Sequence, residues 1–300
     1  MPAFFFISGY LLKNSKLELS FKSYLALQTK SLVFPYIFYS IVSTFYSIVN
    51  STVKKIEIDM YSIIYGYLYG NAEGLTNIVL WFLTCIFSTS IIFYLLYAIY
   101  KTKYIVLISF ILSLTVCYFH RYISIRPPWN LDLSLIALFF FASGKFISDL
   151  NLPPNYFKIN KIKFFILTIA LCLLYFLTVL NGKVDMAFMS FRNPIIFLVN
   201  SFIGIFILLI IGASLPITSM SRFLSKNTLV IFPMHPIFFS IFTGAGIIIF
   251  KFPQNFQANF IWTFVYTIGA LLFSYPISIL LFKFFPILIG GRKGIKIHSS

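Results

Sequence analysis

The chain has 300 residues, of which 60% are hydrophobic, 20% aromatic and only 10% charged. Soluble domains carry about 25% charged residues, and even a fold of about 300 residues buries only about 75% of its chain surface. The composition therefore excludes a water-soluble domain, a disordered chain and a disulfide scaffold, and it indicates a polytopic membrane protein.

The apolar residues gather in long continuous runs, which predict membrane-spanning helices because about 20 apolar residues cross a bilayer as a helix. The runs lack the alternation that is typical of a transmembrane β-barrel. We therefore expect an all-α fold, a polytopic transmembrane helix bundle of about nine spans. In chain order these spans are residues 2–12, 32–50, 78–100, 104–119, 130–147, 164–180, 194–213, 228–250 and 260–285.

The loops between these spans alternate in basic charge, and this alternation explains most of the formal net charge of +16. One set of loops holds 16 basic residues: Lys13, Lys16, Lys22, Lys30, Lys101, Lys103, Lys145, Lys158, Lys161, Lys163, Arg222, Lys226, Lys283, Arg292, Lys293 and Lys296. The opposite set holds 7: Lys54, Lys55, Arg121, Arg126, Lys183, Arg192 and Lys251. By the positive-inside rule the first set faces the cytoplasm, as does the C-terminus. The charge therefore gives no reason to expect a nucleic-acid partner.

Six segments, in matching order along nearly the whole chain, resemble the membrane acyltransferases of the acyltransferase-3 type. The first segment is most similar to the fucose 4-O-acetylase-like branch of that family. The segments are MPAFFFISGYLL at 1–12, KSLVFPY at 30–36, LWFL at 80–83, PWNLD at 128–132 with FFASG at 140–144, KNTL at 226–229, and MHP at 234–236.

The resemblance implies an integral membrane O-acyltransferase of the bacterial plasma (inner) membrane. Such enzymes move an acyl group, usually acetyl, from acyl-CoA to a hydroxyl of a cell-surface sugar or of its lipid-linked precursor. The partners implied are the lipid bilayer, acyl-CoA and a sugar or polysaccharide acceptor. Acetyl-CoA or another acyl-CoA is then a substrate, and no permanently bound cofactor is expected.

The start of the sequence departs from the family pattern. The span at 2–12 is short, no basic residue precedes it, and nothing matches the family's first helix, which carries a His central to catalysis. One more upstream helix would bring the spans to ten. We therefore expect a single acyltransferase-like domain over 1–300 that lacks this helix, either because the reading frame starts late or because the copy is degraded and inactive.

His235 is the first candidate catalytic residue, because it lies inside the apolar run 231–236. An ionisable group within a span is costly and is by default a functional hypothesis. Imidazole can move a proton near neutral pH, so this side chain would activate the acceptor hydroxyl or take up the acyl group. The alternative is a hydrogen-bonded His that braces the Pro-broken helix.

Asp132 is the second catalytic candidate, because carboxylates near a span are rare. Arg121 or Arg126, in the preceding loop, would pair with it. Arg suits bidentate contacts with phosphate, so both Arg are candidate substrate-binding residues at a polar outer mouth. The alternative is a rim that faces solvent or lipid headgroups.

The remaining candidates follow from the segments of resemblance. Lys30 would contact the phosphates of acyl-CoA, with Ser8 and Gly9 lining the acyl path; their alternatives are a topology anchor and a small pair for helix packing. Trp81 and Asn227 would contact the substrate, and the alternative for Trp81 is an interfacial belt residue.

Several missing patterns narrow the chemistry. The sequence has no GxxxxGK[ST] phosphate loop, no GxSxG elbow and no cluster of metal-ligand residues, so no metal site is expected. An ion-coupled pump would need several carboxylates within the spans, and only Asp132 comes close. A transporter or flippase for lipid-linked sugars remains the alternative function, because it shares the many-span architecture.

Overall fold

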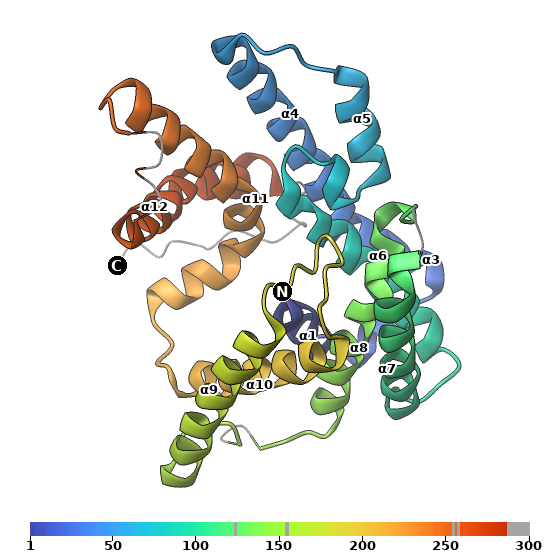
Figure 1. Ribbon diagram of the computed structural model, residues 1–300. Helices are drawn as coiled ribbons and strands as arrows, with labels where there is room; N and C mark the ends of the chain where they lie inside the picture. Colours follow the sequence, from blue (N-terminus) through green and yellow to red (C-terminus); the bar gives the residue numbers. More distant parts are fainter. Residues whose placement is uncertain (123–124, 154–155, 254–255, 257–258, 287–300) are drawn as a thin grey trace. The chain divides into compact units, whose positions relative to one another are not determined.

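The computed structural model describes residues 1–122, 125–153, 156–253, 256 and 259–286, and these residues are mostly helical (Figure 1). Within the described residues no β-strand occurs, and the one extended pairing is an isolated antiparallel bridge between Asp185 and Ser190. In the same part of the chain, eight helices are long and apolar enough to cross a membrane. The all-α, polytopic fold expected from the sequence is confirmed.

Contacts within the chain divide it into two compact units that are interleaved in sequence. Unit 1 consists of Met1–Leu25 and Thr84–Ile217, and unit 2 consists of Ala26–Leu83 and the described residues from Thr218 onward. Helices α3 (Phe21–Gln28) and α6 (Trp81–Tyr97) each contain a boundary between the two units.

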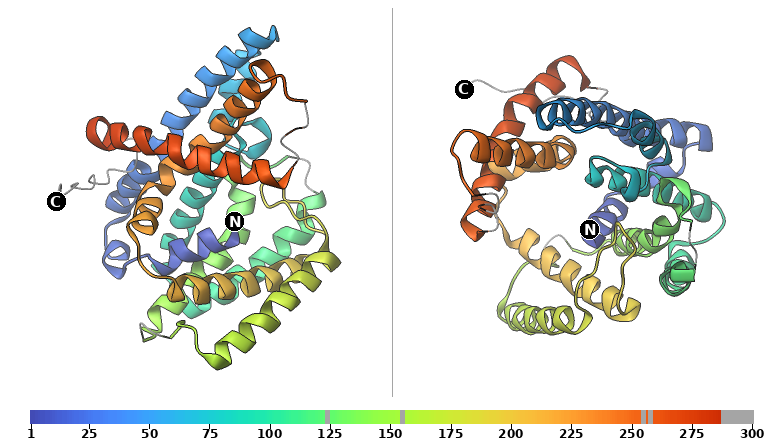
Figure 2. Two further views of the ribbon diagram at one scale, coloured as in Figure 1. Left: turned by 90° about the vertical axis from the view of Figure 1, so that its left-hand side faces the viewer. Right: turned by 45° about the horizontal axis from the view of Figure 1, so that its top comes forward.

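The helices of unit 1 are α1 (Pro2–Tyr10), α2 (Asn14–Leu17), α3 (Phe21–Gln28), α6 (Trp81–Tyr97), α7 (Thr102–Phe119), η4 (His120–Tyr122), η5 (Pro128–Asn130), α8 (Leu131–Asp149), α9 (Lys161–Asn181) and α10 (Pro194–Ser214). The span expected at 2–12 is the nine-residue helix α1, which is too short to cross a bilayer. Figure 2 shows α9 and α10 side by side as an antiparallel pair.

Close backbone contact joins α1 to α8, and two glycines make it possible. A Cβ atom on Gly9 would lie 1.9 Å from the carbonyl oxygen of Phe141, and one on Gly144 would lie 1.9 Å from that of Phe6. No side chain fits at either position, so the helices touch backbone to backbone as small residues allow in membranes.

A buried polar cluster closes the other end of α8. Lys145 is 2% exposed, and its Nζ donates hydrogen bonds to Asn14 Oδ1 and to Asp149 Oδ1 at 2.7 Å. The hydroxyl of Thr102 donates to the second oxygen of Asp149 at 2.8 Å. Both charges are therefore paired, which ties α2 and the start of α7 to α8.

The helices of unit 2 are η1 (Thr29–Val33), α4 (Phe34–Lys54), α5 (Met60–Tyr69), η2 (Ala72–Gly74), η3 (Ile78–Leu80), α11 (Ser219–Ile248) and α12 (Phe260–Phe284). Helices α11 and α12 pack against each other, and α11 also contacts α4 and η3. Asp59 caps α5 by accepting hydrogen bonds from the backbone N–H groups of Tyr61 and Ser62.

Helix α11 begins nine residues before the span that the sequence predicts at 228–250. Thr218 and Ser221 form a capping box: the Thr218 hydroxyl accepts from the Ser221 N–H, and the Ser221 hydroxyl accepts from the Thr218 N–H. This cap starts the helix within a polar stretch, which an apolar pattern does not detect.

Candidate functional site

In unit 1, Asp132 pairs with Arg126 at the start of α8. Arg126 Nε lies 2.9 Å from Asp132 Oδ2, and the two side chains are only 10% and 14% exposed. The same guanidinium donates to the carbonyl oxygen of Ala187, at 2.8 Å, and to Asn130 Oδ1, at 3.2 Å. Arg126 thereby joins α8 to the segment between α9 and α10.

The residues just before α8 hold this ion pair in place. Asn130 is fully buried in a left-handed backbone conformation (φ 51°), and its Nδ2 donates to the hydroxyl of Thr84 on α6 at 2.9 Å. Trp129 is also left-handed (φ 56°), and its carbonyl accepts from Ser88. Such backbone strain persists only where the surroundings hold it.

A cavity of about 340 Å³ lies beside the pair, between the end of α7 and the start of α8. Thr115, His120, Arg126 and Asp132 supply its polar lining, and apolar residues make the remaining walls. Of the two Arg that the sequence offers as partners for Asp132, the structure pairs Arg126. The side chain of Arg121 lies outside the part of the chain that the structure describes.

Both oxygens of Asp132 already accept hydrogen bonds. Oδ2 accepts from Arg126 Nε, and Oδ1 accepts from the backbone N–H of Leu133 at 2.8 Å. Each oxygen of the carboxylate is therefore already engaged, one by the guanidinium and the other by the backbone. This geometry suits Asp132 to positioning Arg126, and a catalytic role for Asp132 stays a prediction.

Of the candidates on α1, Gly9 lies at the backbone contact with Phe141, and the Ser8 hydroxyl donates to the carbonyl of Phe4 at 2.7 Å. The helix-packing role that the sequence offers for this pair is therefore observed for Gly9. A role along the acyl path stays a prediction.

In unit 2, His235 lies on α11 between two prolines, Pro233 and Pro236. Proline has no N–H, so Pro236 cannot donate to the carbonyl of Phe232, four residues before it. His235 Nδ1 lies 2.7 Å from that carbonyl oxygen. Since a carbonyl only accepts, Nδ1 carries the proton, and Nε2 of the neutral ring presents a lone pair.

The aromatic surroundings of His235 hold the ring from both sides. Phe232 and Phe239 lie one helical turn before and after it, with ring centroids 6.0 Å and 5.4 Å away. Phe82, next to Trp81 in the LWFL segment, packs against Phe232 with centroids 5.5 Å apart. The orientation of the imidazole is thus set by its backbone bond and by this packing.

Asn77 is a buried polar residue beside this segment that the sequence does not single out. It is 4% exposed, and its Nδ2 donates both to Ser43 Oγ on α4 and to the carbonyl oxygen of Pro233 on α11, each at 2.9 Å. Its Oδ1 is buried and accepts no hydrogen bond from the residues described. The hydroxyl of Tyr39, one turn before Ser43, is likewise buried without such a bond.

These groups form a polar interior around the Pro-broken turn of α11. Tyr39 and Ser43 share one face of α4, and Asn77 bridges that helix to Pro233. Buried polar atoms are normally hydrogen-bonded, so the unsatisfied Asn77 Oδ1 and Tyr39 hydroxyl favour a site for a polar ligand. The sequence signal was weak: Asn77 is one amide in an aromatic loop.

Trp81 is the first residue of α6 and is 3% exposed. Its ring packs edge-on against that of Phe82, with ring centroids 6.1 Å apart. It is therefore a buried residue of unit 2 and not part of an interfacial belt. Its contact with a substrate stays a prediction.

Lys30 is exposed and lies in η1, a five-residue π-helical segment (Thr29–Val33) between α3 and α4. Such π-helical segments are rare in proteins, and those that occur are often found at functional sites. An exposed ammonium here fits either expectation, a topology anchor or a contact with donor phosphates.

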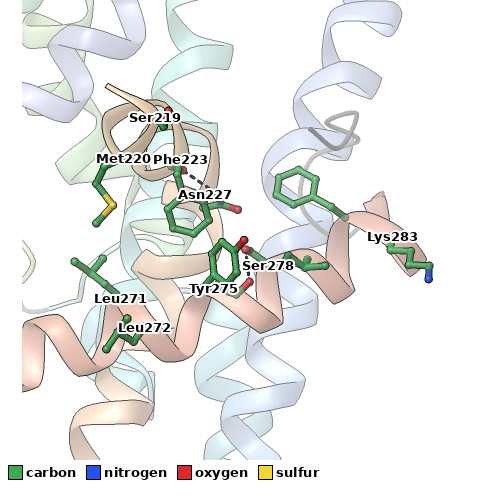
Figure 3. A pocket seen from close by; sticks show the side chains of 11 residues that line it. Ser219, Met220, Phe223, Asn227, Leu271, Leu272, Tyr275, Ser278 and Lys283 are labelled. Atoms are coloured by element: carbon green, nitrogen blue, oxygen red, sulfur yellow. Dashed lines mark hydrogen bonds between the residues drawn. The ribbon is translucent and has the colours of Figure 1, made fainter. Parts of the chain in front are cut away.

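Asn227 is buried on α11, eight residues before His235. It lines a groove between α11 and α12 that Figure 3 shows from close by. Within the described residues, no group of three or more His, Cys, Asp or Glu side chains is arranged to hold a metal ion.

Together, the helices and the polar groups buried among them define a multi-pass membrane protein with polar sites inside its helical units. The family model described as an acyltransferase domain matches residues 1–279. The chain therefore belongs to the acyltransferase-3 family of membrane acyltransferases. Comparison with curated proteins and with solved structures found no match.

Proposed function

We propose that this membrane acyltransferase moves an acyl group, usually acetyl, from acyl-CoA to a hydroxyl of a cell-surface sugar or its lipid-linked precursor. The family fixes acyl transfer as the chemistry. The choice of donor and acceptor rests on the six segments that resemble the family. The first segment is most similar to the fucose 4-O-acetylase-like branch, and membership of that branch is part of the proposal.

His235 is the proposed proton acceptor, and the bond from its Nδ1 to the Phe232 carbonyl is the observation that carries this assignment. The acceptor hydroxyl gives its proton to Nε2 while its oxygen attacks the thioester carbonyl. The tetrahedral intermediate then expels the CoA sulfur, which takes the proton from the imidazolium. Charge and atoms balance without a metal or a second co-reactant.

The polar interior beside His235 supplies contacts for the acceptor. Asn77 Oδ1 can accept a hydrogen bond from one sugar hydroxyl, and the Tyr39 hydroxyl can donate to or accept from another. A site built to hydrogen-bond hydroxyls rejects analogues that lack them, because its own polar atoms are then left unpaired.

In unit 1, Arg126 and Asp132 are proposed to shape the outer polar mouth, with Arg121 as a further contact for the acceptor. The family resemblance implies the bacterial plasma membrane, and the charge of the loops is the reason to propose a cytoplasmic C-terminus. Acyl-CoA then enters from the side that carries Lys30.

The test is a transfer assay with labelled acetyl-CoA in membranes that contain the full-length gene product. Movement of label to an endogenous or added glycan supports the proposal. The transporter alternative predicts the opposite pattern: the label stays on CoA while a lipid-linked sugar crosses the bilayer. The expected additional upstream helix stays a prediction, which reading the gene upstream of Met1 tests directly.

A further inference from the structure

The groove between α11 and α12 has a volume of about 690 Å³ and lies wholly within unit 2. This volume is within the usual range of small-molecule sites. Its walls are mainly the side chains of Met220, Phe223, Leu271, Leu272, Ile279 and Phe282. The lining is therefore mostly apolar, and its few polar groups decide what it can recognise.

One of these polar groups is Asn227, which is 1% exposed. Its Nδ2 donates to the carbonyl oxygen of Phe223 at 2.8 Å, as the dashed line in Figure 3 shows. That bond fixes the amide orientation, because the opposite orientation would set two oxygens against each other. Oδ1 is left as a buried acceptor with no hydrogen bond from the residues described.

A buried hydrogen-bond acceptor such as Asn227 Oδ1 needs a ligand with an N–H or O–H donor. Asn227 lies eight residues after Ser219, the first residue of α11, and therefore about 12 Å along the helix. Ester-linked lipid chains offer only carbonyl acceptors at such a depth, since their donors are in the headgroup. The acceptor instead matches a narrow, neutral chain that carries amide N–H groups along its length.

The charge at the end of the groove gives the second element of recognition. Lys283 lies at the end of α12 and lines the groove with its stem, while its ammonium points outward in Figure 3. Arg222, in the first turn of α11, is exposed. These cations suit an anionic group held outside the groove, and phosphate is the anion that such side chains bind.

We propose that this groove takes the amide-bearing arm of the phosphorylated thioester donor, with Asn227 Oδ1 accepting from an amide N–H and the donor phosphates near Lys283. The assignment rests on the proposed function for the identity of the donor. It gives α11 two tasks, donor binding at Asn227 and proton transfer at His235, two helical turns apart.

A labelling experiment tests the groove without requiring turnover. Leu272, which is 66% exposed, is changed to Cys in a Cys172→Ser background, because Cys172 is the exposed native thiol in the described chain, where Cys85 and Cys117 are buried. The rate of maleimide labelling is measured in nanodiscs with S-ethyl-CoA, a thioether that cannot transfer its group or react with maleimide. We expect labelling to slow at least threefold. Leu208→Cys on α10, 53% exposed and outside the groove, should be unaffected.

Two further measurements show whether the donor's arm, its phosphates or the surrounding lipid protects the cysteine from labelling. Adenosine 3′,5′-bisphosphate, which has the phosphates without the arm, should protect far less than S-ethyl-CoA. If labelling responds only to the nanodisc lipid, for example phosphatidylglycerol against phosphatidylcholine, the groove is a lipid site and the proposal is wrong.

Kinetics of the full-length protein give an independent readout. Asn227→Ala should raise the donor KM about 3- to 10-fold, as expected for one lost hydrogen bond, with kcat within twofold. Asn200→Ala is the matched control, because Asn200 also has a buried, unsatisfied Oδ1 but lies on α10. The groove assignment would be overturned, with the proposed function intact, if the protein transfers the acyl group but S-ethyl-CoA does not slow labelling of the cysteine. Equal donor KM values in wild type and Asn227→Ala would have the same meaning. Absence of transfer would instead contradict the proposed function.

Discussion

The Nδ1 atom of His235 lies 2.7 Å from the carbonyl oxygen of Phe232, the carbonyl to which Pro236 cannot donate. The proline thus creates an acceptor inside the helix, and the adjacent side chain satisfies it. This one bond accounts for how a polar ring is accommodated within a span, and it leaves Nε2 as the basic nitrogen.

Pro236→Ala should weaken this tautomer preference. The new N–H at position 236 competes with His235 Nδ1 for the Phe232 carbonyl, so a larger share of the neutral imidazole carries its proton on Nε2. NMR of protein labelled with ¹⁵N-histidine reports the tautomer, and the His235→Ala spectrum assigns the signal. Transfer activity should fall with the Nδ1–H population. An unchanged tautomer ratio would show that the bond does not set it.

The glycines between α1 and α8 should tolerate no added methyl group. Gly9→Ala and Gly144→Ala each set a Cβ against a carbonyl oxygen at 1.9 Å, and overpacking of this kind costs about 1–3 kcal/mol. The melting temperature in detergent should fall. Gly212→Ala is the control, because its Cβ would meet nothing within 4 Å and a helical Gly→Ala change gains about 0.5–1 kcal/mol. Equal melting temperatures for Gly9→Ala and Gly212→Ala would contradict the packing account.

The Arg126–Asp132 pair should behave as a positioning unit. Asp132→Asn leaves a largely buried guanidinium without its counter-charge and should destabilise the protein by about 1–3 kcal/mol. The double change Arg126→Met with Asp132→Leu removes both charges and should cost less than the single changes Arg126→Met and Asp132→Leu added together. Thermal melts of the four proteins close the cycle. Additive losses would mean that the two side chains act independently.

Asn77 should be sensitive to the type of atom that replaces its Nδ2. Asn77→Ala removes two hydrogen bonds, to Ser43 and Pro233, at about 1 kcal/mol each. Asn77→Asp sets an oxygen against the Pro233 carbonyl and should be the more damaging change, although it is closer in size. Melting temperature and acceptor KM are the readouts. A milder effect of Asp than of Ala would contradict the observed orientation of the amide.

The sequence predicts the helices well because lipid exposure requires continuous apolar runs. Each of the eight long spans contains a run that the hydropathy pattern identifies. The pattern fails at the polar start of α11, where the helix depends on the Thr218–Ser221 cap, and at residues 2–12, where the helix ends after nine residues.

The candidate site could be predicted only in part. His235 and Asp132 are conspicuous because an ionisable group in an apolar run is rare. Asn77 is not, because its importance comes from partners 34 and 156 residues away in sequence. The buried acceptor of Asn227 likewise depends on the Phe223 carbonyl and on the groove with α12, which a family resemblance does not describe.

The most direct test of the central claim is label transfer from acetyl-CoA by the purified full-length protein and by its His235→Ala and Phe239→Leu variants. The wild type and Phe239→Leu should transfer label at rates within a few-fold of each other. His235→Ala should lose at least about 100-fold, the usual contribution of a positioned general base, while retaining its melting temperature. Transfer at the wild-type rate by a folded His235→Ala protein would contradict the account.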